Sequence, residues 1–118
     1  MGLQELHTEI DPETRNAVSA FLEKLVGRFE MVDVILFGSR SRQGHRPDSD
    51  ADIVVLLRGG HGNRMDVAID MAGIAFDVLL ETGILVEALP LGEDEWEHPE
   101  RFNNPFLIEN IRREGVRL

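Results

Sequence analysis

The sequence predicts a single α/β or α+β domain in which a small mixed β-sheet packs with helices in two layers. The first observation behind this prediction is the order of the segments, which reads helix, strand, strand, helix, strand, helix. The second is size, because the chain has 118 residues, of which 42% are hydrophobic, and this is enough to bury one core. We therefore expect residues 1–118 to form one domain.

The first helix is expected over residues 12–29. Asp11 suits the N-cap, Pro12 suits the first helical position, and Glu13 adds a negative charge to the first turn. Apolar residues then recur at helical spacing, namely Val18, Phe21, Leu22, Leu25 and Val26.

Two strands are expected over residues 31–37 and 53–57. The first is rich in β-branched and aromatic residues, and Asp33 indicates partial exposure near one end. The second is a continuous apolar run, which is typical of a strand covered on both faces. The connection over residues 38–50 is short, so an antiparallel pairing would place the end of the first strand beside the start of the second.

A second long helix is expected from Asn63, its N-cap, to about Glu81, with Gly83 ending it. The periodicity predicts a polar face formed by Asp66, Asp70, Gly73, Asp77 and Glu81. The opposite, apolar side comprises Met65, Ala68, Ile69, Ala72, Phe76 and Leu79.

The last third of the chain predicts one more strand and one more helix. The strand is expected over residues 84–89, closed by Pro90, and the helix-containing crossover before it is compatible with a parallel, right-handed pairing with the second strand. Residues 93–101 are acidic and irregular, with Trp96 packing this segment onto the core. The final helix is expected from Pro105 to near Gly115.

Composition restricts the classes of function. The formal net charge is -10, and no basic stripe appears, so binding of DNA or RNA is not expected. The absence of cysteine excludes disulfides, thiolate metal sites and a cysteine nucleophile. Neither a membrane-spanning run nor a signal peptide is apparent, and a cytoplasmic location is the expectation.

The functional signal lies between Gly38 and Asp52. Gly38 and Ser39 form a turn after a strand, where backbone N–H groups and a hydroxyl can hold a polyphosphate. Asp50 and Asp52 are two residues apart at the start of the next strand, so their carboxylates face the same side and can share a hard cation. Mg²⁺ held by carboxylates and substrate phosphates is the usual arrangement in nucleotide chemistry.

The same residues carry a family resemblance. Gly38–Ser39–Arg40, then Gly44, then Ser49–Asp50–Ala51–Asp52 resemble the signature of the DNA polymerase β superfamily of nucleotidyltransferases, most closely its minimal prokaryotic members. The expected order of elements also resembles theirs over roughly residues 12–115. The long fixed spacing, with a strand on each side, makes this signature more specific than a Gly-Ser or an Asp-x-Asp alone.

The resemblance implies a polymerase-β-type fold and transfer of a nucleoside monophosphate, AMP from ATP in the first place, to a hydroxyl with loss of pyrophosphate. Gly38, Ser39 and Arg40 would bind the nucleotide, while Asp50 and Asp52 would ligate Mg²⁺ in a two-ion site. A third carboxylate on a later strand helps to activate the hydroxyl in such proteins. The candidate by position is Glu87, where the family more usually has Asp.

Glu87 and its competitor have alternative interpretations. Partial exposure at a sheet edge explains a carboxylate in an apolar strand as well as catalysis does. Asp77 is the other candidate third carboxylate, but its helical periodicity assigns it to a solvated face.

The loop cations also have two interpretations. Arg40, Arg42 and Arg46 either contact phosphates or neutralise Asp48 and the aspartate pair. His45 has no partner at metal-ligand spacing and is expected to be a solvent-exposed loop histidine.

The sequence is therefore compatible with two classes of function. The first is a Mg²⁺-dependent nucleotidyltransferase. The second is a weak or inactive module of the same fold that docks a helical partner protein. Some similar proteins act as antitoxins that adenylylate an all-helical toxin, so a small helical partner could also be the acceptor.

Overall fold

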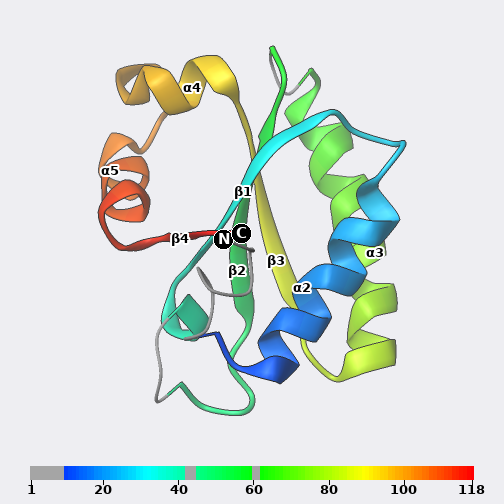
Figure 1. Cartoon of the computed structure of the whole chain (residues 1–118). Helices are drawn as coiled ribbons and strands as arrows, with labels where there is room; N and C mark the ends of the chain where they lie inside the picture. Colours follow the sequence, from blue (N-terminus) through cyan, green and yellow to red (C-terminus); the bar gives the residue numbers. More distant parts are fainter. Residues whose placement is uncertain (1–9, 42–44, 60–61) are drawn as a thin grey trace, which may run out of the picture.

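A four-stranded mixed sheet forms the centre of the protein (Figure 1). The computed structural model describes residues 10–41, 45–59 and 62–118. The strands are β1 (Met31–Phe37), β2 (Ala51–Leu57), β3 (Val86–Gly92) and β4 (Val116–Arg117). Their order is β3-β2-β1-β4; β1 runs antiparallel to β2 and β4, and β2 runs parallel to β3. The structure thus has the antiparallel pairing that the short connection allowed and the parallel pairing with which the helical crossover is compatible.

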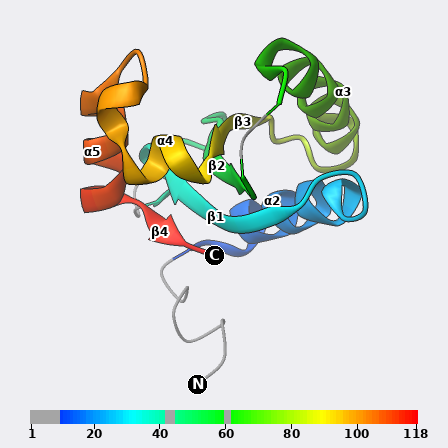
Figure 2. The ribbon, with the colours of Figure 1, turned by 90° about the horizontal axis from the view of Figure 1, so that it is seen from above.

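Helices cover both faces of the sheet, so the domain has three layers and the predicted two-layer arrangement is wrong (Figures 1 and 2). The helices are α2 (Pro12–Leu25), α3 (Arg64–Thr82), α4 (Glu93–Glu97) and α5 (Pro105–Glu114), with 3₁₀ turns η1 (Ser39–Ser41) and η2 (Pro99–Arg101). Successive side chains of β2 point to opposite faces of the sheet, and this explains the layers. Ile53, Val55 and Leu57 belong to the apolar cluster under α2 and α3. Val54 and Leu56 belong to the cluster under α5.

The helix α2 begins as predicted but ends earlier. The Asp11 carboxylate accepts hydrogen bonds from the Thr14 N–H (3.1 Å) and the Thr14 hydroxyl (2.6 Å). Val26 is the C-cap, and Gly27 follows with φ of +86°, so the chain leaves the helix four residues before the predicted end.

The helix α3 has its predicted ends but not its predicted orientation. Asn63 accepts a hydrogen bond from the Asp66 N–H, and Gly83 ends the helix. The side packed against the sheet comprises Met71, Ile74, Ala75 and Val78. The predicted apolar side instead leaves Met65, Ile69 and Phe76 between 57% and 68% exposed. The acidic face was predicted correctly, since Asp66, Asp70, Asp77 and Glu81 are all exposed.

Pro90 does not close β3, which continues to Gly92. The strand lies at the edge of the sheet and pairs only with β2 among the described strands, so a residue without an N–H is tolerated there. At its end, the Arg64 guanidinium donates to the Pro90 carbonyl (2.5 Å) and pairs with the Glu95 carboxylate. These contacts attach the beginning of α3 to the end of β3.

The C-terminal segment contains elements that local sequence patterns did not reveal. Residues 93–97 form the short helix α4, and β4 adds two residues beside Ile35 and Leu36 of β1. A strand of two residues has too little periodicity to be recognised and depends on its long-range pairing. The final helix, Pro105–Glu114, agrees with the prediction. No helix within residues 10–41, 45–59 and 62–118 is long and apolar enough to cross a membrane.

The α2 cap generates a prediction about acid stability. Burial alone would raise the pKa of Asp11, but the hydroxyl and N–H of Thr14 and the contact with His45 lower it from 3.8 to about 2. A lowered folded-state pKa stabilises the protein above pH 3.8, and this contribution is lost as the pH falls towards 2. We expect Asp11→Ala to lower the free energy of unfolding by roughly 1 kcal/mol at pH 7.

Urea unfolding at several pH values checks this expectation. The difference between wild type and Asp11→Ala should shrink between pH 4 and pH 2. Glu13→Ala, in the exposed first turn of the same helix, is the matched control and should have a much smaller effect. A difference that stayed constant over this pH range would contradict the role assigned to the carboxylate.

Candidate active site

The Gly-Ser turn begins where β1 ends. Gly38 follows Phe37 with φ of +74°, and the 3₁₀ turn η1 then starts at Ser39. The carbonyl of Gly38 accepts two hydrogen bonds from Ser41, one from its hydroxyl (2.6 Å) and one from its N–H (3.2 Å). The turn is therefore held by its own residues, and Ser41 is a contributor that the sequence analysis did not identify.

Gly38 lies directly against the carboxylate of Asp52. The antiparallel register pairs Phe37 with Asp52, so the end of β1 meets the start of β2. A Cβ atom on Gly38 would stand 2.5 Å from Oδ2 of Asp52. The positive φ favours glycine, and an added Cβ would force the Asp52 carboxylate to shift. The structure thus brings the Gly-Ser turn and the aspartate pair together.

Glu87 comes to the same place from the neighbouring strand. The parallel register of β2 and β3 pairs Asp52 with Glu87. The Glu87 carboxyl interacts with the carboxyls of both Asp50 and Asp52, and it is exposed at the sheet edge. Three candidate residues from two parts of the chain therefore form one carboxylate cluster.

Two carboxyls of the cluster, those of Asp52 and Glu87, have raised pKa values. Burial raises the pKa of Asp52, a hydrogen bond with Glu87 opposes this, and the charge of Asp50 raises it further. Burial also raises the pKa of Glu87, and the carboxyls of Asp50 and Asp52 add to that shift. Like charges in close proximity favour the protonated form unless a cation compensates them.

The donor set fits a hard divalent cation. All three side chains supply carboxylate oxygens, the ligand type that Mg²⁺ prefers, and their mutual repulsion favours a positive charge between them. Within the described residues, no group of three or more Asp, Glu or His side chains is already arranged so that it could hold a metal ion. A cation held by Asp50 and Asp52 would therefore need further oxygen ligands from outside the protein.

Arg40 is buried beneath the loop that carries Asp50. Arg40 is only 1% exposed. The guanidinium donates from Nε to the Ser49 carbonyl (2.6 Å), from Nη2 to the Pro47 carbonyl (2.7 Å) and from Nη1 to the Thr14 hydroxyl (2.8 Å). This geometry assigns the Arg40 side chain to holding the loop on α2, and it does not support the expected contact between its guanidinium and a nucleotide.

The same network gives His45 a role that the sequence analysis missed. Its Nε2 lies 2.7 Å from Oδ1 of Asp11, and its side chain is 14% exposed, so the prediction of a solvent-exposed loop histidine is wrong. Asp11 could be recognised as a helix cap, but a partner 34 residues away has no local signature.

The remaining loop cations are Arg42 and Arg46. Arg46 forms an exposed pair with Asp48 (3.5 Å), as one of the two interpretations of the loop cations predicted. Arg42 and Gly44 lie outside the described residues.

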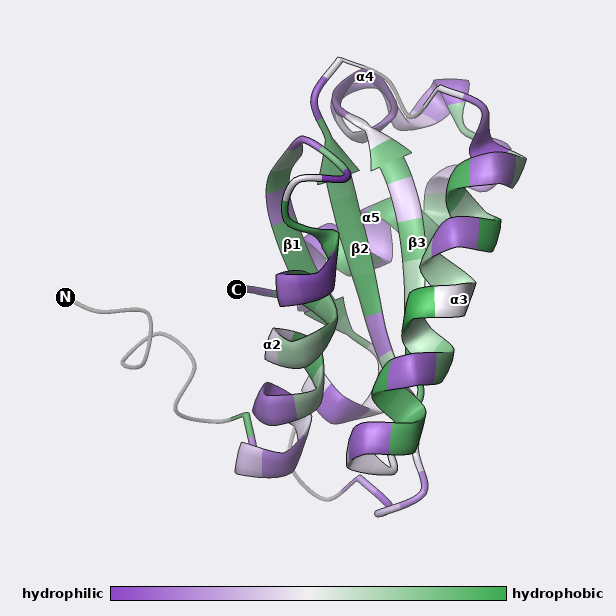
Figure 3. Ribbon diagram, turned by 90° about the vertical axis from the view of Figure 1, so that its right-hand side faces the viewer, coloured by the Kyte–Doolittle hydropathy of each residue, from purple (hydrophilic) through white to green (hydrophobic). Residues whose placement is uncertain are grey.

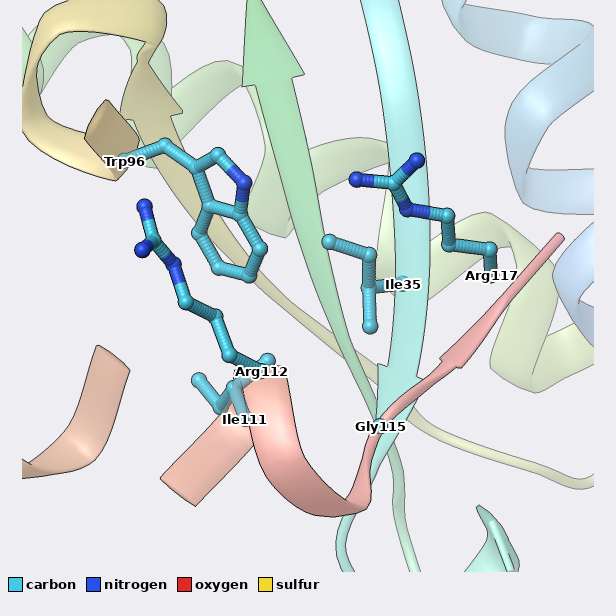
Figure 4. Close-up of a pocket in the computed structure, with 6 residues that line it drawn as sticks. All are labelled: Ile35, Trp96, Ile111, Arg112, Gly115 and Arg117. Atoms are coloured by element: carbon cyan, nitrogen blue, oxygen red, sulfur yellow. The ribbon is translucent and has the colours of Figure 1, made fainter. Parts of the chain in front are cut away.

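A cavity lies on the α5 side of the sheet, the side on which strand alternation also places Asp52 and Glu87 (Figure 4). It has a volume of about 460 Å³ and is lined by Ile35, Trp96, Ile111, Arg112, Gly115 and Arg117. The Arg112 guanidinium lies 4.9 Å from the centre of the Trp96 ring, which packs against the apolar cluster of that face. The cavity contains none of the predicted site residues.

Comparison with known proteins agrees with this geometry. Residues 18–118 match the family described as "Nucleotidyltransferase domain", and the chain belongs to that family. A crystal structure from Sulfolobus solfataricus, described provisionally as a nucleotidyltransferase, is similar at 20% identity with a TM-score of 0.57. The similarity covers 99% of this chain and 89% of that one, which supports the fold. Comparison with curated proteins gave no match.

The close approach at Gly38 generates a second prediction. We expect Gly38→Ala to weaken Mg²⁺–ATP binding at least tenfold, because the added methyl group displaces the Asp52 carboxylate. Left-handed strain should also lower the free energy of unfolding by about 1–2 kcal/mol. Gly27→Ala is the matched control: its φ is +86°, but no atom lies within 4 Å of the position that its methyl group would occupy.

Isothermal titration calorimetry and urea unfolding separate the two effects. Gly27→Ala should share the loss of stability and retain nucleotide binding. Equal nucleotide binding by wild type and Gly38→Ala would contradict the proposed contact with the site.

The carboxylate cluster generates a third prediction. In metal-free protein, Asp52→Asn should raise the melting temperature or leave it unchanged, because it removes one member of a like-charge group. The control is Asp48→Asn in the exposed loop pair. Thermal unfolding in EDTA at pH 7 measures the effect. A loss of several degrees with Asp52→Asn would indicate instead that the carboxylate is structurally required.

Proposed function

We propose that this protein is a Mg²⁺-dependent nucleotidyltransferase that transfers a nucleoside monophosphate, AMP from ATP in the first place, to a hydroxyl group. The observation that carries this proposal is the convergence of Asp50, Asp52 and Glu87 beside the Gly38 turn. Membership of the nucleotidyltransferase family supports the same reaction class.

Each part of the site has a chemical role in this proposal. The backbone N–H groups of the Gly38–Ser39 turn and the Ser39 hydroxyl bind the terminal phosphates. Asp50 and Asp52 hold Mg²⁺, which when bound neutralises phosphate charge and orients the α-phosphoryl group. Arg40 acts as a positioning residue, because it holds the loop that carries Asp50.

Glu87 is the group best placed to accept the acceptor's proton. The acceptor oxygen forms a bond to the α-phosphorus, the bond from that phosphorus to the bridging oxygen breaks, and pyrophosphate leaves with the electron pair. The hydroxyl proton passes to the carboxylate of Glu87, which lies beside Asp52 on the neighbouring strand.

We further propose that the acceptor is a hydroxyl on a partner protein. The net charge of -10 disfavours a nucleic-acid acceptor, since such binding depends largely on neutralising phosphates. Partner Tyr, Ser and Thr residues carry suitable hydroxyls, and a protein encoded beside this one is the first candidate to test.

The fourth prediction separates nucleotide binding from transfer. Asp50→Asn and Asp52→Asn should each weaken Mg²⁺–ATP binding sharply, because each removes a negative charge from the metal site. Glu87→Gln should slow transfer of label from ATP more than it weakens ATP binding. Calorimetry and incubation with α-labelled ATP and the candidate partner measure the two properties.

Asp77→Asn, on the exposed acidic face of α3, is the control for a general change in charge. Equal ATP binding by wild type and the double variant Asp50→Asn/Asp52→Asn would reject the metal site. Labelling of RNA ends with the partner untouched would reject the protein acceptor.

A further inference from the structure

An exposed apolar row runs along α3. It comprises Met65, Ile69, Ala72, Phe76 and Leu80, and we call it the α3 row. The members follow one another at steps of four or three residues, so they share one side of the helix. The four large side chains are between 57% and 70% exposed.

The α3 row is not required by the core. The sheet-facing side of the helix already buries Met71, Ile74, Ala75 and Val78. Among the described residues, seven large hydrophobic side chains are exposed, and four of them lie in this row. Such concentration on one helix face is typical of an interaction surface, whereas single exposed apolar residues are ordinary.

The α3 row adjoins a hollow at the edge of the sheet. A cavity of about 400 Å³ lies between α3 and the edge strand β3, and residues 85–88 line its strand side. Ala68, Ala72 and Ala75 contribute small side chains from the helix. Ala72 belongs to both the row and the hollow, and Glu87 lines the same hollow. Alternation along β3 places Val86 and Ala88 on the α3 side and Glu87 with Asp52 on the α5 side, so the hollow and the candidate site are separate surfaces.

The other border of the α3 row is acidic. Asp66, Asp70, Asp77 and Glu81 lie one position beyond members of the row and are exposed. Figure 3 shows hydrophobic and hydrophilic residues alternating along α3. Glu81 pairs with Lys24 of α2 (3.0 Å), which places this border on the α2 side of the helix.

The negative charge beside the α3 row indicates which kind of molecule would bind there. A second copy of this chain would bring another acidic helix and another net charge of -10 to the interface. A partner helix with an apolar face and a flank of Lys or Arg fits both features. The row extends from residue 65 to 80, about 22 Å, so a helix of roughly four turns matches its length.

We propose that the α3 row and the adjoining hollow form the docking surface for an amphipathic helix of a partner protein, with basic side chains of that helix over the acidic border. The docking does not depend on catalysis.

The fifth prediction tests the docking with defined probes. The probes are synthetic 20-residue amphipathic helices with a Leu face and one Tyr, flanked either by Lys and Arg or by Glu. Fluorescence anisotropy should show binding of the basic peptide and no binding of the acidic one. Ile69→Ser and Phe76→Ser should each weaken binding of the basic peptide at least tenfold.

Two matched controls address non-specific attraction between a basic peptide and an acidic protein. Val26→Ser removes an apolar side chain that is 70% exposed at the end of α2, and Phe106→Ser removes one that is 75% exposed on α5. Both variants should bind the basic peptide as the wild type does. The double variant Asp70→Lys/Asp77→Lys should reverse the preference, binding the acidic peptide and losing the basic one.

Different outcomes overturn different statements. Failure of wild type to bind the basic peptide, or equal binding by the row variants, rejects the docking surface. A wild-type dimer in analytical ultracentrifugation that Ile69→Ser converts to monomers assigns the surface to a second copy. The proposed function is measured separately on the same proteins, as Mg²⁺–ATP binding, which the row variants should retain.

Discussion

The buried guanidinium of Arg40 is the interaction on which the geometry of the site depends. It donates to two carbonyls of the loop before β2, at Ser49 and Pro47, and to the Thr14 hydroxyl of α2. A cation withdrawn from water is tolerated only when its donors are satisfied, so these oxygens have restricted positions. The planar fork of arginine suits three fixed acceptors, whereas lysine offers a single mobile charge. Asp50 is the residue that follows this loop, and its position is thereby linked to the first helix.

The same site contains a conflict between stability and chemistry. Asp52 and Glu87 sit in neighbouring strands with Asp50 nearby, and both carry raised pKa values because of burial and like charge. A protein selected only for stability would not place three carboxylates together. The arrangement makes sense if a cation and a polyphosphate complete it. The surrounding apolar strand and the network at Arg40 supply the stability that the cluster lacks.

Local patterns in the sequence predicted much of this structure. The caps at Asp11 and Asn63, the apolar run of β2 and the short connection between β1 and β2 indicated the helices and the antiparallel pair. The spacing from Gly38 to Asp52 indicated the site, since antiparallel register brings its ends together. What escaped prediction depends on contacts between distant residues: the partners of Arg40, the contact of His45 with Asp11, and the pairing of β4.

The error on α3 has a different physical origin. The helix carries two apolar rows, and periodicity alone does not say which one faces the sheet. The row with Met65, Ile69 and Phe76 has the larger side chains, yet the sheet accepts the row with Met71, Ile74 and Val78. Only the tertiary arrangement of β3 beside α3 decides between them.

The exposed row on α3 also bears on how the free protein behaves as a colloid. Apolar helix faces attract one another, and what opposes that attraction between copies is their shared negative charge of -10. This repulsion has a range of about 8 Å at physiological ionic strength and vanishes near the isoelectric point. The pI of 4.7 therefore marks the acidity at which the free chain loses its electrostatic protection. Solubility and partner choice thus depend on the same acidic surface.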